Sequence, residues 1–171
     1  MGTRLHSRLR FAPPRVQVDQ RSDGSMVLRS PQPLGSYARA IGEWLLRWAS
    51  EAPDRAFLAE RVGDGWRKIT YRETLDAVRR IGEALLARGL DASKPVALLS
   101  DNSIEHALLS LGAMHVGVPV APISAAYSLM SKDHAKLKAI FELIEPGLVW
   151  AAEPEKYVAA LASVEIGRAH V

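Results

Sequence analysis

The stretch that decides the fold is PVALLSDNSIEHALLSLGAMHVGVPVAPIS, Pro95 to Ser124. Its first six residues form an apolar run without polar alternation, which is typical of a strand covered on both faces of a parallel sheet. Asn102 and Glu105 then fit the spacing of a capping box, and apolar residues recur at helical spacing until Gly117. Because VPVAPI is a second apolar run, the stretch predicts a strand, a helix and another buried strand.

The segment from Ala107 to Met130 contains no Asp, Glu, Lys or Arg, and it is long enough on paper to cross a bilayer. Gly117, Pro119 and Pro122 interrupt it. A membrane span needs one continuous helix to satisfy its backbone. The segment therefore predicts a helix, a short strand and a loop, with no membrane span.

Downstream, SKDHAKLKAIFELIEP predicts a helix that opens at Ser131 with Asp133 in its first turn. Leu137 and Phe141 belong to its apolar side, and LVWAA predicts a third strand. From Lys94 to Ala152 the order is β-α-β-α-β, which implies parallel strands with right-handed crossovers.

Upstream patterns predict hairpins and helices. These are a hairpin from Arg15 to Arg29, a helix from Ser36 to Ser50, a hairpin across Gly63-Asp64-Gly65, and a helix from a Thr70/Glu73 capping box to Gly89. The expected fold class is α/β: a parallel β-α-β-α-β unit preceded by hairpins and a helix.

Composition limits the function classes. The 171 residues carry a net charge of +3, and the excess of arginine lies in the first thirty residues rather than along a folded face. We therefore expect no nucleic-acid partner. The chain has no cysteine, which excludes disulfides, thiolate metal sites and a cysteine nucleophile. The start has no apolar secretory block, so we expect a cytoplasmic protein, with organelle import as a minor alternative.

Four stretches together resemble the N-terminal part of adenylate-forming (AMP-binding) acyl-CoA synthetases, and most closely the feruloyl-CoA synthase type. They are WASEAPDRAFLAER (48–61), GWRKITYRE (65–73), Pro95 to Ser124, and AYSLMSKDHAKL (126–137). The resemblance implies the N-terminal subdomain of that fold. It also implies a parent enzyme that uses ATP and Mg²⁺ to adenylate a carboxylic acid, such as ferulate, and then forms a thioester with coenzyme A.

The elements that would carry this chemistry in the family are a Ser/Thr/Gly-rich loop with a Lys, an acidic magnesium ligand and a late catalytic Lys. None of them is recognised here. The nearest glycines, Gly63-Asp64-Gly65, Gly112 and Gly117, lie in a predicted hairpin and helix. We therefore assign no catalytic, cofactor-binding or metal-binding residue, and we expect the chain alone to be inactive and poorly soluble or marginally stable. Gly112, Ala113 and Gly117 are expected to let their helix pack closely on the sheet.

The expected organisation is a flexible arm (1–14), an incomplete adenylation domain (15–164) and a non-native tail (165–171). The ending IGRAHV corresponds to ATC GGA AGA GCA CAC GTC, a common sequencing-adapter string. Two alternatives stay open: a medium- or long-chain fatty acyl-CoA synthetase, or a non-enzymatic α/β binding module. An in-frame continuation past Glu165 into the phosphate loop would favour an enzyme.

Several other residues could be read as functional, but a structural or surface role is the preferred interpretation for each of them. His106, His115 and His134 are titratable, but no partner in the sequence marks His106 as a general base, so we expect a structural histidine. Two groups of residues can be considered as metal ligands, and neither has the spacing of a known zinc or calcium site. They are Glu153, Glu155 and His170, and Asp101 with His106. The four tryptophans are candidates for a platform on which an aromatic acid stacks: Trp44, Trp48, Trp66 and Trp150. Helical spacing instead predicts that Trp44 and Trp48 are core residues.

Overall fold

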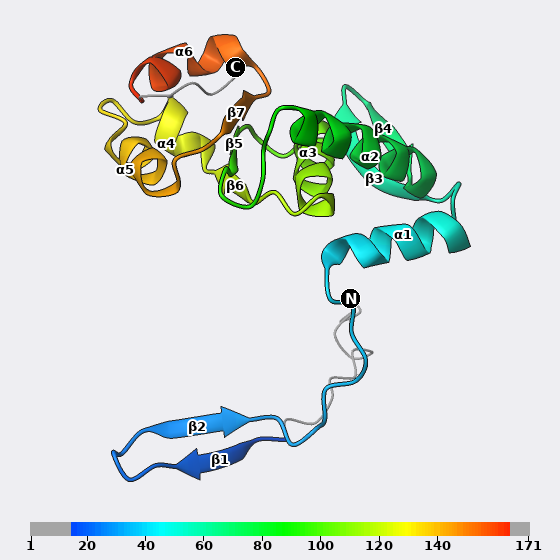
Figure 1. Ribbon diagram of the computed structural model, residues 1–171, viewed down its shortest axis with the longest axis vertical. Helices are drawn as coiled ribbons and strands as arrows, with labels where there is room; N and C mark the ends of the chain where they lie inside the picture. The colour runs from blue at the N-terminus through cyan, green and yellow to red at the C-terminus, as the bar shows by residue number, and fades with distance from the viewer. Residues whose placement is uncertain (1–14, 165–171) are drawn as a thin grey trace, which may run out of the picture. The chain divides into compact units, whose positions relative to one another are not determined.

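The computed structural model describes residues 15–164 of the chain. The chain divides into two units, residues 1–37 and 38–171. In the first unit, β1 (Gln17–Gln20) and β2 (Met26–Arg29) pair antiparallel (Figure 1). Gly24 has a φ of +84°, and the Asp23 carboxylate accepts the Ser25 N–H at 2.9 Å. The hairpin predicted between Arg15 and Arg29 is confirmed.

A three-stranded parallel sheet forms the centre of the second unit. Its order is β6 (Val120–Ile123), β5 (Val96–Leu99) and β7 (Leu148–Ala151). Val96 is paired with Val120 on one side and with Leu148 on the other. All four β5 residues are fully buried. The predicted β-α-β-α-β unit and its parallel strands are therefore confirmed.

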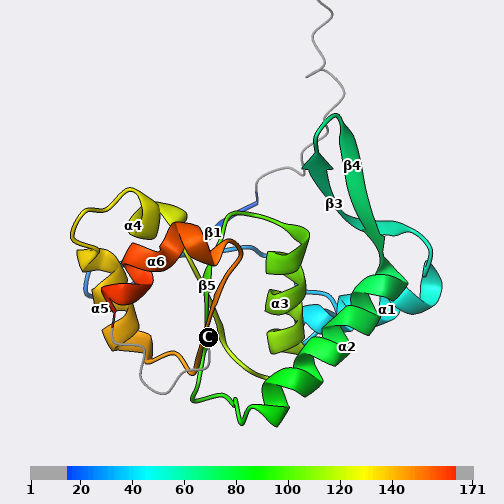
Figure 2. The same cartoon turned by 90° about the horizontal axis from the view of Figure 1, so that it is seen from above.

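Helices cover both faces of this sheet, as Figure 2 shows. Val96 and Leu98 pack on one side with residues of α2 (Tyr71–Ala87) and α3 (Ile104–His115). Ala97 and Leu99 pack on the other with residues of α5 (Ala135–Ile144) and α6 (Pro154–Ala162). The alternation of side chains along the strand thus divides the core into two layers.

The second hairpin and the helix after it form as predicted. β3 (Ala56–Val62) pairs antiparallel with β4 (Gly65–Thr70), and Gly63 takes a φ of +56° at the turn. Both arms of the capping box are present, since Thr70 Oγ1 accepts the Glu73 N–H and the Glu73 carboxylate accepts the Thr70 N–H. Gly89, with a φ of +72°, follows the end of α2 as expected.

Close packing of α2 on α3 depends on two glycines. A Cβ on Gly112 would lie 2.5 Å from Ile81 Cγ2, and one on Gly82 would lie 2.6 Å from Val116 Cγ1. Gly112 was expected to let α3 approach the sheet, and this is wrong because its bare side faces α2. Ala113 of α3 is buried in the core with the strands, and Leu109 of the same helix packs against that core.

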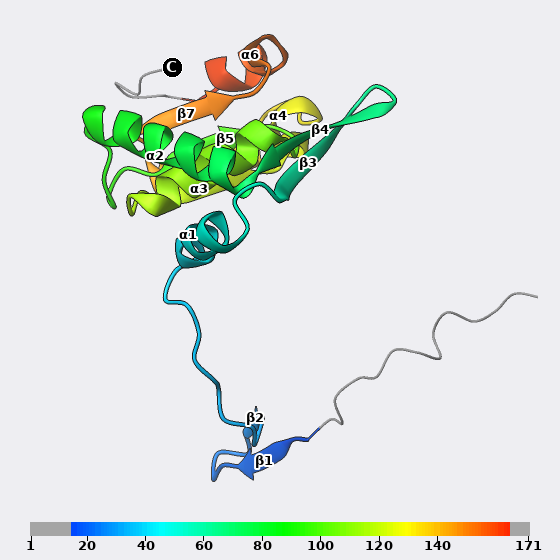
Figure 3. The same ribbon diagram turned by 90° about the vertical axis from the view of Figure 1, so that its right-hand side faces the viewer.

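Helix α1 (Ile41–Glu51) begins later than the predicted Ser36. Ala40 is extended and provides no side-chain cap, and Glu43 accepts the N–H of Arg39 instead. Leu45 packs with Leu75 and Val78 of α2. Figure 3 shows α1 lying beneath α2 and α3. The apolar residue Ile41 is largely exposed.

Two other helix starts differ from the predictions. Ser103, not Asn102, caps α3, because its hydroxyl accepts the His106 N–H. The helix expected from Ser131 begins at Ala135 and follows a separate short helix, α4 (Ala125–Leu129). The Ser131 hydroxyl accepts the His134 N–H, and Asp133 accepts the Ala135 N–H from outside the helix. Leu137 and Phe141 are buried as predicted.

Among the described residues, no helix combines the length and apolar character needed to cross a bilayer. The expected arm at residues 1–14 and the non-native tail at 165–171 lie outside the described residues.

Candidate functional site

The order in which strands are added to the sheet reverses at β5. From β5 the chain passes through α3 to β6 on one side of β5. From β6 it passes through α4 and α5 to β7, which lies on the other side of β5. In open α/β sheets, ligands bind at such switch points, outside the carboxyl ends of the strands. The residues that follow β5 directly, Ser100 and Asp101, are therefore the first candidates for a site.

Ser100 and His106 meet at this end of the sheet. Ser100 Oγ lies 2.7 Å from His106 Nδ1, and Ser100 is buried while His106 is partly buried. The sequence indicated no serine partner for His106, and the structure corrects this, because the turn between β5 and α3 folds the two residues together. Among the described residues no carboxylate hydrogen-bonds to the ring. The pair therefore joins strand to helix without the third group that orients a catalytic imidazole.

The amino end of α3 is already occupied by protein acceptors. Glu60 of β3 accepts the Ile104 N–H at 2.7 Å, and Ser103 accepts the His106 N–H at 3.0 Å. A helix start binds phosphate through such N–H groups. Because these two donors are satisfied, the first turn of α3 does not form a phosphate site in this arrangement.

An ion cluster fastens the β3–β4 hairpin to the same helix end. The Arg67 guanidinium lies 3.1 Å from Glu60 and also contacts the Glu105 carboxylate. The hydrogen bond from Arg67 holds the pKa of Glu105 below its ordinary value, and the same bond raises the pKa of Arg67. The cluster keeps Glu105 ionised and ties three elements together.

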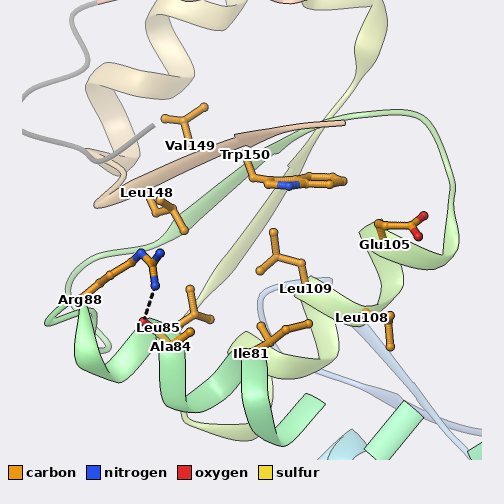
Figure 4. A pocket seen from close by; sticks show the side chains of 10 residues that line it. All are labelled: Ile81, Ala84, Leu85, Arg88, Glu105, Leu108, Leu109, Leu148, Val149 and Trp150. Carbon is orange, nitrogen blue, oxygen red and sulfur yellow. Dashed lines mark hydrogen bonds between the residues drawn. The ribbon is translucent and has the colours of Figure 1, made fainter. Parts of the chain in front are cut away.

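A mostly apolar cavity of about 790 Å³ lies between α2, α3 and β7 (Figure 4). The Trp150 ring forms one wall, above Leu109 of α3. Arg88 lies near Leu148 and donates to the Ala84 carbonyl at 3.0 Å, whereas Glu105 lies toward the Trp150 end. Sequence reasoning missed this cavity, although the partly apolar α2 face and Trp150 were signals for it.

The other candidate residues do not converge on one site. His115 is exposed in the last turn of α3, whereas His134 is buried with Nε2 3.1 Å from the Ser128 carbonyl oxygen. Glu153 forms an ion pair with Lys156, and Glu155 is exposed. His170 lies outside the described residues. The residues that the structure describes here therefore form no common cluster.

The tryptophans are also separate. Trp44 is 47% exposed, so its predicted core position is wrong, because the buried side of α1 is centred on Leu45. Trp48 is half-buried beside Tyr71, with a ring separation of 6.2 Å. Trp66 is exposed near the hairpin turn, under the Arg61 guanidinium.

The described residues include no group of three His, Cys, Asp or Glu side chains placed to hold a metal. Gly63 and Gly65 belong to the hairpin turn, Gly112 packs on Ile81, and Gly117 lies just beyond the end of α3. No phosphate-binding loop is formed by these glycines.

The parallel sheet with its central switch point defines a doubly wound α/β protein. The chain belongs to the AMP-binding enzyme family, whose model matches residues 45–170. A curated relative is luciferin 4-monooxygenase of Luciola mingrelica, which is 33% identical over 67 residues, covering 39% of this chain and 12% of that protein.

Solved structures show the same fold. A fatty acyl-adenylate ligase from L. pneumophila superposes with a TM-score of 0.62 at 18% identity, over 69% of this chain and 20% of the other. A Mycobacterium tuberculosis fatty acyl CoA synthetase gives 0.61 at 23% identity, over 74% of this chain and 25% of the other. The chain thus spans between about an eighth and a quarter of the length of these proteins.

Proposed function

We propose that the protein is an acid:CoA ligase, which adenylates a carboxylic acid and passes the acyl group to the thiol of coenzyme A. The observation that carries the proposal is the family match over residues 45–170, which includes the whole parallel unit. Adenylation turns a carboxylate oxygen into a good leaving group, and ATP with Mg²⁺ supplies that chemistry.

The role proposed for residues 15–164 is structural. The buried strand β5 and its flanking helices form a rigid part of the adenylation domain, and the Glu60–Arg67–Glu105 cluster fixes the start of α3 against the hairpin. Among the described residues no three His, Cys, Asp or Glu side chains form a cluster, and we assign no step of adenylation to these residues. We accordingly propose that the 171-residue chain alone is inactive.

For the substrate we propose a hydroxycinnamic acid such as ferulate. The support is the resemblance of AYSLMSKDHAKL, residues 126–137, to feruloyl-CoA synthases. In the fold this segment contains most of α4, the turn with buried His134, and the start of α5.

The test is a thioester-formation assay of the full-length enzyme with ferulate, benzoate and octanoate. We expect turnover of ferulate, and use of octanoate alone would refute the substrate proposal. The 171-residue chain should show no ATP–pyrophosphate exchange, and measurable exchange would refute its proposed inactivity. Failure of the full-length enzyme to form any thioester or adenylate would refute the ligase proposal itself.

A further inference from the structure

The β3–β4 hairpin meets α3 through one of its two faces. Glu60 and Arg67 are direct partners across the two strands, so their side chains lie on the same face. The Glu60 carboxylate accepts the Ile104 N–H at 2.7 Å, which places this face against the start of α3. The next pair, Arg61 and Trp66, lies on the opposite face because side chains alternate along a strand, and it forms a cation–π contact of its own at 5.6 Å.

Polar contacts lead from the Glu60–Arg67 pair to the end of β5. The Arg67 guanidinium lies 3.1 Å from Glu60 and also contacts Glu105 in the first turn of α3. His106 is the next residue, and its Nδ1 lies 2.7 Å from Ser100 Oγ. Ser100 is buried and directly follows β5. Consecutive contacts therefore join the hairpin, the first turn of α3 and the carboxyl end of β5.

Burial makes the first of these contacts depend on Arg67. The Glu60 side chain is only 22% exposed, and Ile104 is 2% exposed. A largely buried carboxylate that loses its cationic partner is destabilised, and it regains hydration by turning toward water. That movement would leave the buried Ile104 N–H without its acceptor, so the first turn of α3 would have to shift. His106 lies in this turn and would shift with it.

We propose that Arg67 and His106 are positioning residues for the turn after β5, where Asp101 is exposed at the carboxyl end of the sheet. Arg67 fixes the start of α3 through two carboxylates, and His106 links that start to Ser100. Open α/β sheets bind their ligands at this end. The hairpin thus sets the geometry of the ligand-binding end without contacting a ligand. This role rests on the ligase activity proposed above.

Nitrogen-detected NMR of the His106 ring tests the link in the 171-residue chain without any ligand. Arg67→Met keeps an unbranched side chain and removes the charge, so it should move the Nδ1 signal in the direction in which Ser100→Ala moves it. Arg61→Met makes the same exchange on the opposite face of the hairpin and should leave the signal in place. No shift in Arg67→Met, or an equal shift in Arg61→Met, would overturn the proposal.

A double variant separates a movement of the helix from a change in the electric field at the ring. Once Ser100→Ala has removed the ring's partner, adding Arg67→Met should cause no further shift. A further shift as large as that in the wild-type background would overturn the proposal, because a lost charge acts on the ring with or without the hydroxyl. Arg67→Lys serves in the same comparison if methionine prevents folding, since lysine keeps the charge but cannot bridge both carboxylates as a planar fork.

Kinetics of the full-length enzyme test the functional consequence. Arg67→Met should lower kcat/KM for thioester formation by about two- to thirtyfold, and Arg61→Met should change it little. Equal kinetics for the two variants would overturn the positioning role. A full-length protein without ligase activity would refute the proposed function and this role with it, whereas an absent NMR shift in an active enzyme would refute the positioning role alone.

Discussion

Replacing Gly112 with alanine tests whether α2 and α3 pack through bare backbone. The added Cβ would lie 2.5 Å from Ile81 Cγ2, 2.8 Å from Ile81 Cβ and 3.3 Å from the Val78 carbonyl oxygen. Overpacking of this kind costs about 1–3 kcal/mol, and the stiff β-branched isoleucine favours the upper half of that range. Alanine regains about 1 kcal/mol of helix propensity. We therefore expect Gly112→Ala to lower the free energy of unfolding by about 1–2 kcal/mol.

The assay is urea unfolding followed by circular dichroism, with thermal unfolding as a second measurement. A chain of this size should lose roughly 3–6 °C in Tm for that change. Gly42→Ala is the control, because the nearest atom to its Cβ is His115 Nδ1 at 4.0 Å. That variant should gain about 0.5 kcal/mol. If Gly112→Ala is as stable as Gly42→Ala, the proposed contact between the helices is wrong.

Three further measurements test other contacts. Glu60→Ala should lower the free energy of unfolding by about 1–2 kcal/mol, because it leaves the Ile104 N–H without its acceptor. The control Glu51→Ala removes an exposed ion pair and should change the free energy of unfolding by less than about 0.5 kcal/mol. Equal effects of the two substitutions would contradict the proposed capping of α3 by Glu60. The hydrogen bonds from Thr70 hold the pKa of Glu73 below its ordinary value, so its stabilisation is present above that value and is lost as pH falls through the folded pKa. Glu73→Gln should reduce the slope of stability against pH between about pH 5 and 3, and an unchanged slope would show that Glu73 is not responsible. Ser100→Ala should shift the tautomer balance of the His106 ring in nitrogen-detected NMR, because Nδ1 loses its partner; an unchanged ring spectrum would exclude this bond in solution.

The sheet could be predicted from the sequence because its strands carry their own signals. The β5 run is apolar without alternation, and Gly117 and the prolines around β6 mark where α3 ends and where the next strand lies. Periodicity also identified Leu137 and Phe141 as buried. These features depend on local pattern, which a single sequence displays directly.

Contacts between segments that lie far apart in the chain could not be predicted from the sequence. Glu60 lies far from Ile104 in the chain, so no pattern could assign its carboxylate to the start of α3. The Ser100–His106 bond depends on the path of one turn. Trp44 had helical spacing but lies on the exposed side of α1, because periodicity gives a face and cannot say what covers it.

The order of strands has a consequence for the speed of folding. Pairing β5 with β6 joins Val96 to Val120, whereas pairing β5 with β7 joins Val96 to Leu148, more than twice as far along the chain. Each doubling of a closed loop costs about 0.6 kcal/mol of entropy, and distant parallel pairings slow folding. We expect β7 to join after β5 and β6, so that an intermediate exposes one side of the most buried strand in the protein. The yield on refolding should therefore fall with concentration more steeply than the stability of the folded chain would suggest.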